Sequence, residues 1–330
     1  MDISTTYLGL TLKHPFMVGA SPLGAHIDTV RRLEDAGSSA IVLPSIFEEQ
    51  ISMAQGGKIH HMDPLDAEFA ELLAPFPSPE RYPLSPDAYL EHLRRVKAAV
   101  HVPVIASLNG MTKEPWLAFA RMLEQAGADA IELNMYGLAT EATEPAAAVE
   151  ARIRNTVVEL KRHLHVPLAV KLLPFFTAFG HFAHALDDAR ADGLVLFNRF
   201  YEPDIDEGSM TFVPRIVLST NHELPLRLHW TAILHGRVRC SLAITGGVET
   251  AADGVKAILA GAHAVQLVSA ILRSGAGYIG VMRDGLTAWM HAHAMDSLER
   301  IRGRVEALGA TDLTERANYL NTLLQTGRTP

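Results

Sequence analysis

The chain has 330 residues, 48% of them hydrophobic, and a formal net charge of -8. This length and composition favour a single barrel-sized domain with a large core, and the lack of a long basic run disfavours a nucleic-acid partner. The longest apolar runs are far shorter than the roughly 20 residues that span a bilayer, so no membrane span is predicted. The single cysteine, Cys240, and an N-terminus without a signal-peptide pattern predict a cytoplasmic location.

Short apolar runs alternate along the chain with longer segments of helical period. This alternation predicts βα units and a parallel sheet. Because the runs are apolar at nearly every position, both faces of each strand should be buried, which favours a (β/α)8 TIM barrel with long βα insertions. The eight predicted strands are Phe16–Ala20, Ala40–Pro44, Val104–Leu108, Ala130–Asn134, Leu168–Leu172, Leu194–Asn198, Leu242–Thr245 and Ala264–Val268.

Two connections are longer than ordinary βα loops. One is a proline-rich insertion over residues 45–85, after the second strand, and the other separates Asn198 from Leu242. Extra length at strand C-termini usually builds the active-site face of a barrel, so residues 199–213 are predicted to form a lid there. A surface loop without a role is the alternative.

The remaining organisation follows from helical patterns near the end of the chain. The barrel domain is predicted to cover residues 1–310 and to close with a helical stretch from Ile279 to about Ala307. The tail, residues 311–330, is predicted to contain a short amphipathic helix from Asp312 to Gln325. An oligomer contact is one interpretation of this helix.

A Gly-Gly turn after the seventh strand is the most informative local pattern. Gly246 and Gly247 follow the strand directly and open a helix, and Ser269 ends the next strand. Paired glycines let backbone N–H groups approach a phosphate, and a helix N-terminus adds partial positive charge. Barrels often bind phosphate at this place, so we predict a phosphate site, with a tight turn lacking a ligand as the alternative.

Three polar residues end predicted strands on the same side of the barrel. Lys171 lies in an apolar strand, where an unpaired charge is costly, so it needs an anionic partner, either a ligand or a carboxylate. Asn134 and Asn198 end the fourth and sixth strands, where a short amide is placed to contact a planar ring. Together with the glycine turn, they predict a ring of polar groups at the barrel mouth.

Short motifs spread over most of the chain carry a resemblance to a known family. They are His14-Pro15-Phe16-Met17 with Ala20-Ser21, Ser107-Leu108-Asn109-Gly110-Met111, Ile131-Glu132-Leu133-Asn134, Val170-Lys171-Leu172 and Thr245-Gly246-Gly247-Val248. In these motifs the chain resembles the dihydroorotate dehydrogenase family, FMN-dependent (β/α)8 barrels of pyrimidine biosynthesis that are often dimers. The resemblance implies a flavoprotein oxidoreductase and a small-molecule substrate. It implies FMN contacts at Ala20, Ser21, Ser107, Asn134, Lys171, Gly246, Gly247 and Ser269, and substrate contacts at Asn134 and Asn198.

The chain departs from the family pattern at four places. The family carries its catalytic base, a cysteine or serine, where this chain has Gly137, and a family lysine corresponds to Ser45. Trp230 and Val268 stand where the family has glycine, and their side chains are expected to obstruct a phosphate or ring. Because dihydroorotate oxidation needs a base while hydride leaves to the flavin, these departures predict a divergent branch with an altered substrate.

The identity of a base, and two other functions, stay open at this point. Weak candidates for the base are Tyr136, Tyr201, His60 and His61, and none of the sixteen histidines has a telling ligand spacing, so no metal is predicted. One alternative function is a non-catalytic or partner-binding barrel that retains only the phosphate site. The other is a flavin-free lyase or isomerase that uses Lys171 to form a Schiff base.

Overall fold

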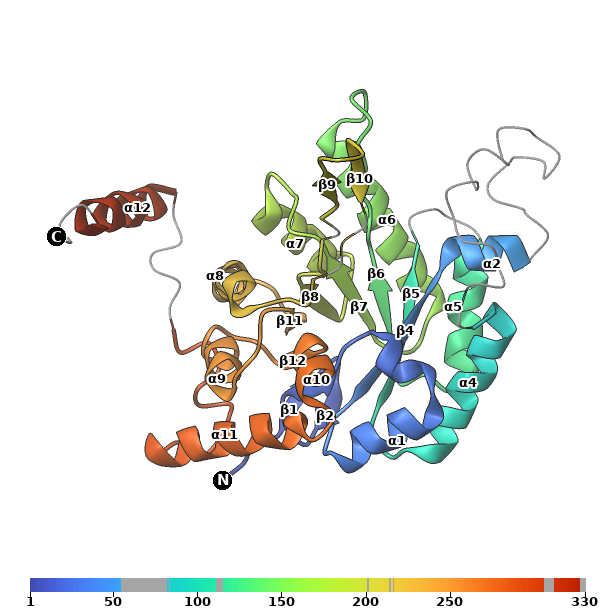
Figure 1. Cartoon of the computed structure of the whole chain (residues 1–330), viewed down its shortest axis with the longest axis horizontal. Coiled ribbons are helices and arrows are strands. Elements are labelled where there is room, and N and C mark those ends of the chain that lie inside the picture. Colours follow the sequence, from blue (N-terminus) through green and yellow to red (C-terminus); the bar gives the residue numbers. More distant parts are fainter. Residues whose placement is uncertain are drawn as a thin grey trace.

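A closed barrel of eight parallel strands forms the centre of the protein. The computed structural model describes residues 1–54, 82, 84–110, 115–200, 202–213, 215, 217–305 and 312–326. The strand order is β11-β12-β3-β4-β5-β6-β7-β8, with helices between the strands (Figure 1). The predicted (β/α)8 barrel is confirmed, and each predicted strand is present: β3 (Phe16–Val18), β4 (Ile41–Phe47), β5 (Val104–Asn109), β6 (Ala130–Asn134), β7 (Leu168–Leu172), β8 (Gly193–Leu196), β11 (Ser241–Thr245) and β12 (Ala264–Leu267).

Most of the described helices surround the barrel and bury one apolar face against it, whereas the last one, at the end of the chain, stands apart from the barrel (Figure 1). In α6, for example, the buried residues Ile153, Thr156, Val157 and Leu160 recur at three- and four-residue spacing, as one face of a helix requires. The helices are α1 (Ile27–Asp35), α2 (Glu48–Ala54), α4 (Pro86–Ala99), α5 (Pro115–Gln125), α6 (Ala146–His163), α7 (Phe179–Asp188), α8 (Leu224–Leu234), α9 (Ala251–Leu259), α10 (Ser269–Ser274), α11 (Tyr278–Ala292) and α12 (Asp312–Thr326), with short 3-10 turns η1 (Pro22–Ala25) and η3 (Asn221–Glu223).

Carboxylates fix two equivalent junctions between a helix and the next strand. Glu34 accepts hydrogen bonds from both N–H groups of the His101-Val102 step, at 2.7 and 3.0 Å. Glu124 does the same at the His165-Val166 step, at 2.7 and 2.8 Å. A proline follows each step and has no N–H, so the carboxylates satisfy the last donors before the strand begins.

An N-terminal hairpin fills the end of the barrel opposite to the mouth. Its strands are β1 (Thr5–Tyr7) and β2 (Leu10–Leu12), and its side chains pack against small interior residues of the barrel strands, among them Ala130 and Ala169. The N–H of Leu8 donates to Ser241 Oγ at 3.1 Å, at the start of β11. The floor of the barrel is therefore closed by the protein's own side chains.

The two long connections are only partly within the described residues. Residues 45–54 of the first insertion complete β4 and form α2, whereas residues 55–81 and 83 lie outside the description. Within residues 199–213, β9 (Asp204–Asp206) and β10 (Thr211–Val213) pair as an exposed antiparallel ribbon. Figure 1 shows this ribbon at the same end of the barrel as α2, which follows the C-terminal end of β4. A lid function for the ribbon stays a prediction.

The helix predicted from Ile279 to about Ala307 was too long. Helix α11 ends at Ala292, and Ala294 takes a left-handed conformation with φ of 52°. The chain beyond this point bonds instead to the N-terminus, since the N–H of Asp2 donates to the carbonyl of Asp296 at 2.7 Å. Farther along, Oε2 of Glu315 in α12 lies 3.6 Å from Nε2 of His229 in α8.

None of the helices in the described ranges combines the length and apolarity needed to cross a membrane.

A histidine at the base of β12 makes the fold sensitive to acid. His263 Nδ1 accepts the N–H of Leu242 at 3.0 Å. Burial, helped by the nearby Arg302, lowers the pKa of His263 from 6.5 to about 4. The unfolded chain takes up this proton more readily than the folded chain, so the stabilisation is complete above pH 6.5 and is lost as the pH falls towards 4.

Acid titration should therefore reveal this histidine. We expect the free energy of unfolding in urea to fall by about 2 kcal/mol across this window, after allowance for partial exposure of the ring. The variant His263→Gln keeps an acceptor for Leu242 but does not titrate, so it should show a shallower decline. Identical declines in both proteins would contradict this role.

Candidate functional site

Three cavities adjoin one another at the C-terminal ends of the barrel strands. Named by residues that line them, they are the glycine cavity (about 110 Å³; Lys171, Gly246 and Ser269), the serine cavity (about 300 Å³; Ser21 and Ser45) and the amide cavity (about 340 Å³; Asn109, Asn134 and Asn198). Ala20 lines both the glycine and serine cavities, and Asn198 lines both the glycine and amide cavities. Most of the predicted site residues thus meet at one end of the barrel.

The glycine turn is packed against helix α8. Gly246 and Gly247 have φ values of 81° and 79°, the left-handed conformation that favours glycine. A Cβ on Gly247 would lie 2.7 Å from the backbone nitrogen of Leu224, and a Cβ on Gly246 would lie 2.9 Å from Arg227 Nη2. The left-handed conformation therefore favours glycine at both positions, and the backbone of α8 leaves no room for a side chain at Gly247, while Gly246 also faces the glycine cavity.

Ser219 lies inside the predicted phosphate cradle. Its hydroxyl donates to Ser269 Oγ at 2.9 Å and accepts the N–H of Gly247 at 3.3 Å. Ser269 Oγ also accepts the N–H of Ser219 at 3.0 Å. Because hydroxyl groups rotate, the two serines can turn their donors towards an anion in the cavity. Sequence analysis missed Ser219, which lies in an irregular segment before α8 and has no motif around it.

A buried arginine supports the turn from behind. Arg227 of α8 donates to the backbone carbonyls of Thr245 at 2.5 Å, Glu223 at 2.7 Å and Phe197 at 3.4 Å. It also pairs with the Glu223 carboxylate at 3.2 Å. Burial lowers the pKa of this guanidinium, but the ordinary value for arginine is high enough to keep it charged. Arg227 therefore joins the ends of β8 and β11 to α8.

Lys171 has a carboxylate partner inside the barrel. Its Nζ lies 3.2 Å from Glu132 Oε1 and 3.5 Å from Gln266 Oε1, and Gln266 donates to the other oxygen of Glu132. All three side chains are buried. The carboxylate that the sequence offered as an alternative to a ligand is thus present, and Lys171 lines the glycine cavity as well. The pair fixes the position of the lysine and leaves it beside the space for a ligand.

The two predicted asparagines are hydrogen-bonded to each other. Asn198 Nδ2 donates to Asn134 Oδ1 at 2.9 Å, and Asn198 Oδ1 accepts the N–H of Arg199 at 2.8 Å. A third amide, Asn109 at the end of β5, stands in register with Asn134 and lines the same cavity. Asn109 was part of a matching motif but was not predicted as a site residue.

The serine cavity contains an unsatisfied polar group. Ser21 is buried, and its hydroxyl has no hydrogen-bond partner within the described residues. Ser45, where the family has a lysine, lies with its Oγ 2.7 Å from Ser107 Oγ. Ser107 itself is fully buried beneath this wall. This part of the mouth therefore presents neutral hydroxyl groups.

The candidate bases are distributed unevenly. Tyr136 lines the amide cavity, whereas Gly137 is exposed in the segment after β6. Tyr201, His60 and His61 lie outside the described residues. Tyr136 thus remains as a predicted base within the described part of the chain.

The two predicted obstructions behave differently. Trp230 packs edge-on against Phe179, with ring centroids 4.9 Å apart, so the expectation that it obstructs the cavity is wrong. Its side chain lies on the face of α8 that packs against α7. Val268 does line the glycine cavity, and its Cγ2 would lie 2.9 Å from a Cβ on Gly19. Val268 therefore narrows the cavity beside β3.

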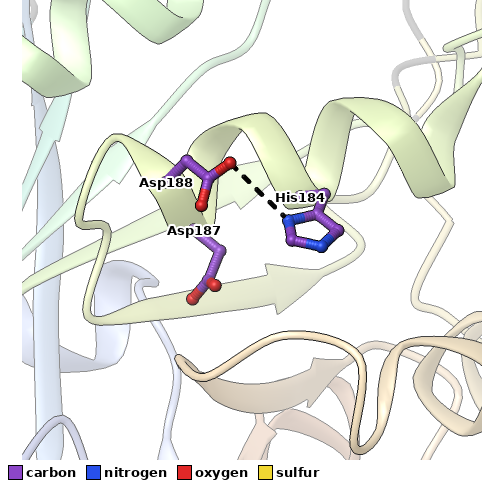
Figure 2. A group of neighbouring side chains, drawn as sticks. All are labelled: His184, Asp187 and Asp188. Carbon is purple, nitrogen blue, oxygen red and sulfur yellow. Dashed lines mark ion pairs between the residues drawn. The ribbon is translucent and has the colours of Figure 1, made fainter.

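One group of three potential metal ligands occurs among the described residues, at the end of α7. It consists of His184, Asp187 and Asp188, and Figure 2 shows the ion pair between His184 and Asp188. Asp187 accepts from Arg239 Nε and from the N–H of Cys240, both at 2.9 Å. Since these bonds anchor the start of β11, the group has a structural role and no metal is assigned to it.

Comparison with known proteins places the chain in a family. The dihydroorotate dehydrogenase family model matches residues 85–290. The chain belongs to this family. Members of the dihydroorotate dehydrogenase family are oxidoreductases, and the matched range includes β5 to β12 and the polar strand ends described above.

Relatives of two kinds are similar to nearly the whole chain. The dihydroorotate dehydrogenase B (NAD(+)) catalytic subunit of Thermoplasma volcanium is 27% identical over 310 residues, covering 92% of this chain and 98% of the relative. The corresponding subunit of Methanosarcina mazei is 28% identical over 314 residues, covering 90% and 93%. The NAD-dependent dihydropyrimidine dehydrogenase subunit PreA of Escherichia coli is 24% identical over 326 residues, covering 92% and 76%.

Proposed function

We propose that this family member is an FMN-dependent oxidoreductase that oxidises a small planar ring of the dihydroorotate type. The observation that carries the proposal is the meeting of the glycine turn, Lys171 and the asparagine pair in adjoining cavities at the barrel mouth. The names of the relatives support it, since both kinds are dehydrogenases of a dihydro ring.

The residues at the mouth fit this cofactor. The unsatisfied hydroxyl of Ser21 and the charge of Lys171 both lie on cavity walls. We assign the phosphate to Gly246, Gly247 and Ser269, and the ring to Ala20, Ser21, Asn134 and Lys171, with Ser107 acting through its contact with Ser45. When bound, FMN would supply the acceptor for hydride.

The chain's own residues would position the substrate and exclude water. Asn134 and Asn198 present amides that match the polar edge of a planar ring, and their mutual bond fixes their orientation. Tyr136 lines the same cavity, and its phenol oxygen, after it has passed its own proton to solvent, is the proposed acceptor of the substrate proton. The exposed Gly137 has no side chain for that task.

Flavin content tests this function directly. The purified protein should be yellow and should release FMN on denaturation, and dihydroorotate should bleach the bound flavin under anaerobic conditions. Riboflavin, which lacks the phosphate, serves as the matched control and should be retained much more weakly. Colourless protein that does not retain added FMN would contradict the proposal and favour the barrel that keeps only a phosphate site. Borohydride trapping of a carbonyl compound on Lys171 would favour the Schiff-base alternative.

Two expectations from the sequence are carried forward as proposals. We propose a cytoplasmic location, supported by the lone buried thiol of Cys240, and a homodimer, supported by the family resemblance. Sedimentation of the purified protein as a monomer would contradict the dimer. A purified protein with no free thiol would contradict the reducing location.

A further inference from the structure

The amide cavity carries positive charge in addition to its asparagines. Arg199 and Arg215 both line it, and none of the described residues on its walls is acidic. Phe47, Tyr136 and Phe200 supply aromatic surface. The cavity thus combines flat apolar walls, amide groups and cationic groups, which suits a planar, amide-bearing ring with an anionic substituent.

The two arginines differ in how their charge is balanced. Arg215 pairs with Asp204 at 2.7 Å on the exposed β9–β10 ribbon. Arg199 is half-buried and lines both the amide and the glycine cavities. In the part of the chain that the structure describes, no acceptor bonds to the Arg199 guanidinium, and the charged neighbour that it influences is another cation, Arg227. Arg199 is therefore the cation in this cavity whose charge is not offset.

The position of Arg199 determines what its charge would meet. It directly follows Asn198, and its own backbone N–H donates to the side-chain oxygen Oδ1 of Asn198 at 2.8 Å. A ring bound to the asparagine pair would therefore lie next to the guanidinium. A half-buried guanidinium forms its strongest hydrogen bonds with a carboxylate, because its planar N–H donors match the two carboxylate oxygens.

We propose that Arg199 makes this site selective for a ring that carries a carboxylate over the same ring without one. The inference rests on the proposed function and sharpens it, because the two kinds of relative are named for substrates that differ in this respect. Dihydroorotate carries a carboxylate, whereas a simple dihydropyrimidine such as dihydrouracil is uncharged. Arg199 places this chain with the carboxylate-bearing class.

Calorimetric titration with orotate and uracil tests the inference, because these rings differ only in the carboxylate. The wild-type protein should bind orotate at least about tenfold more tightly than uracil. The variant Arg199→Gln should lose orotate affinity by about 10- to 100-fold and keep its uracil affinity. Added salt should weaken orotate binding and leave uracil binding unchanged.

A matched control lies outside the cavities. Arg162 pairs with Glu159 at 3.2 Å on the exposed part of α6 and lines none of the three cavities, so Arg162→Gln should leave orotate affinity within about threefold of the wild type. Arg199→Lys keeps the charge without the planar fork and should retain part of the preference. It keeps the comparison available if Arg199→Gln does not fold.

Several results would overturn the inference. These are equal binding of orotate and uracil by the wild-type protein, failure to bind either ring, and an unchanged preference in Arg199→Gln. Loss of FMN in Arg199→Gln with orotate selectivity intact would show that the arginine serves the cofactor instead. Flavin content of the same samples reports separately on the proposed function, since flavin-free protein that prefers orotate would contradict that function and support the role of Arg199.

Discussion

Replacement of Lys171 by methionine should lower the free energy of unfolding by about 3–5 kcal/mol. Methionine has a similar length, but it leaves the Glu132 carboxylate buried without the ammonium that lies 3.2 Å away. Gln266 remains as a donor to this carboxylate, and a single neutral hydrogen bond does not replace a counter-ion. Urea denaturation of the variant and the wild type measures the difference.

A double variant separates this structural role from a role at the site. Lys171→Met combined with Glu132→Gln removes both charges and keeps an oxygen for the Gln266 donor, so most of the stability should return. Reduction of the proposed flavin by substrate should nevertheless stay impaired, because the ammonium of Lys171 then no longer lines the glycine cavity beside the proposed position of the ring. Reduction at the wild-type rate in the double variant would limit Lys171 to a structural role.

Replacement of Arg227 by methionine should cost about 3 kcal/mol of stability and release the proposed FMN. The carbonyls of Thr245 and Phe197 would lose a donor in a buried place, and each such loss costs roughly 1–3 kcal/mol. The Gly246 turn would lose the group against which it packs. Thermal unfolding and the fraction of FMN retained after gel filtration measure the two effects.

The same substitution at an exposed arginine provides the control. Arg300 pairs with Asp296 at 2.9 Å, and about two thirds of each side chain is exposed. Arg300→Met should therefore change stability by no more than about 0.5 kcal/mol and leave the flavin content unaltered. A loss of similar size in both variants would show that the buried carbonyl bonds of Arg227 contribute little.

The barrel was predictable because each strand is a short apolar run buried on both faces. The clustering of Lys171, Asn134 and the glycine turn followed from the same pattern, since the C-terminal ends of parallel strands in a barrel lie on one face. The partner of Lys171 also had a signal that was not used. Glu132 is an acidic residue within an apolar strand, and this strand neighbours the strand of Lys171. An ion pair between the two opposite charges was therefore predictable.

The parts that were missed depend on contacts that no local pattern encodes. Arg227 lies on a helix, where arginine is usually exposed, and its burial results from packing against a turn farther along the chain. Ser219 comes from an irregular segment. Trp230 was wrongly expected to face the cavity. The sequence separation between Trp230 and the glycine turn does not tell which face of α8 carries its side chain, and this face packs against Phe179 of α7.

The hairpin that seals the barrel floor constrains the order in which the chain can assemble. Thr5 Oγ1 donates to the carbonyl of His263, and Arg302 donates to Thr5, across sequence separations of 258 and 297 residues. A nascent chain leaving the ribosome therefore carries this hairpin long before its partners are translated. Until β11 and β12 emerge, β3 and β8 remain as open sheet edges, which exposes the growing polypeptide to aggregation and makes closure a late, slow event.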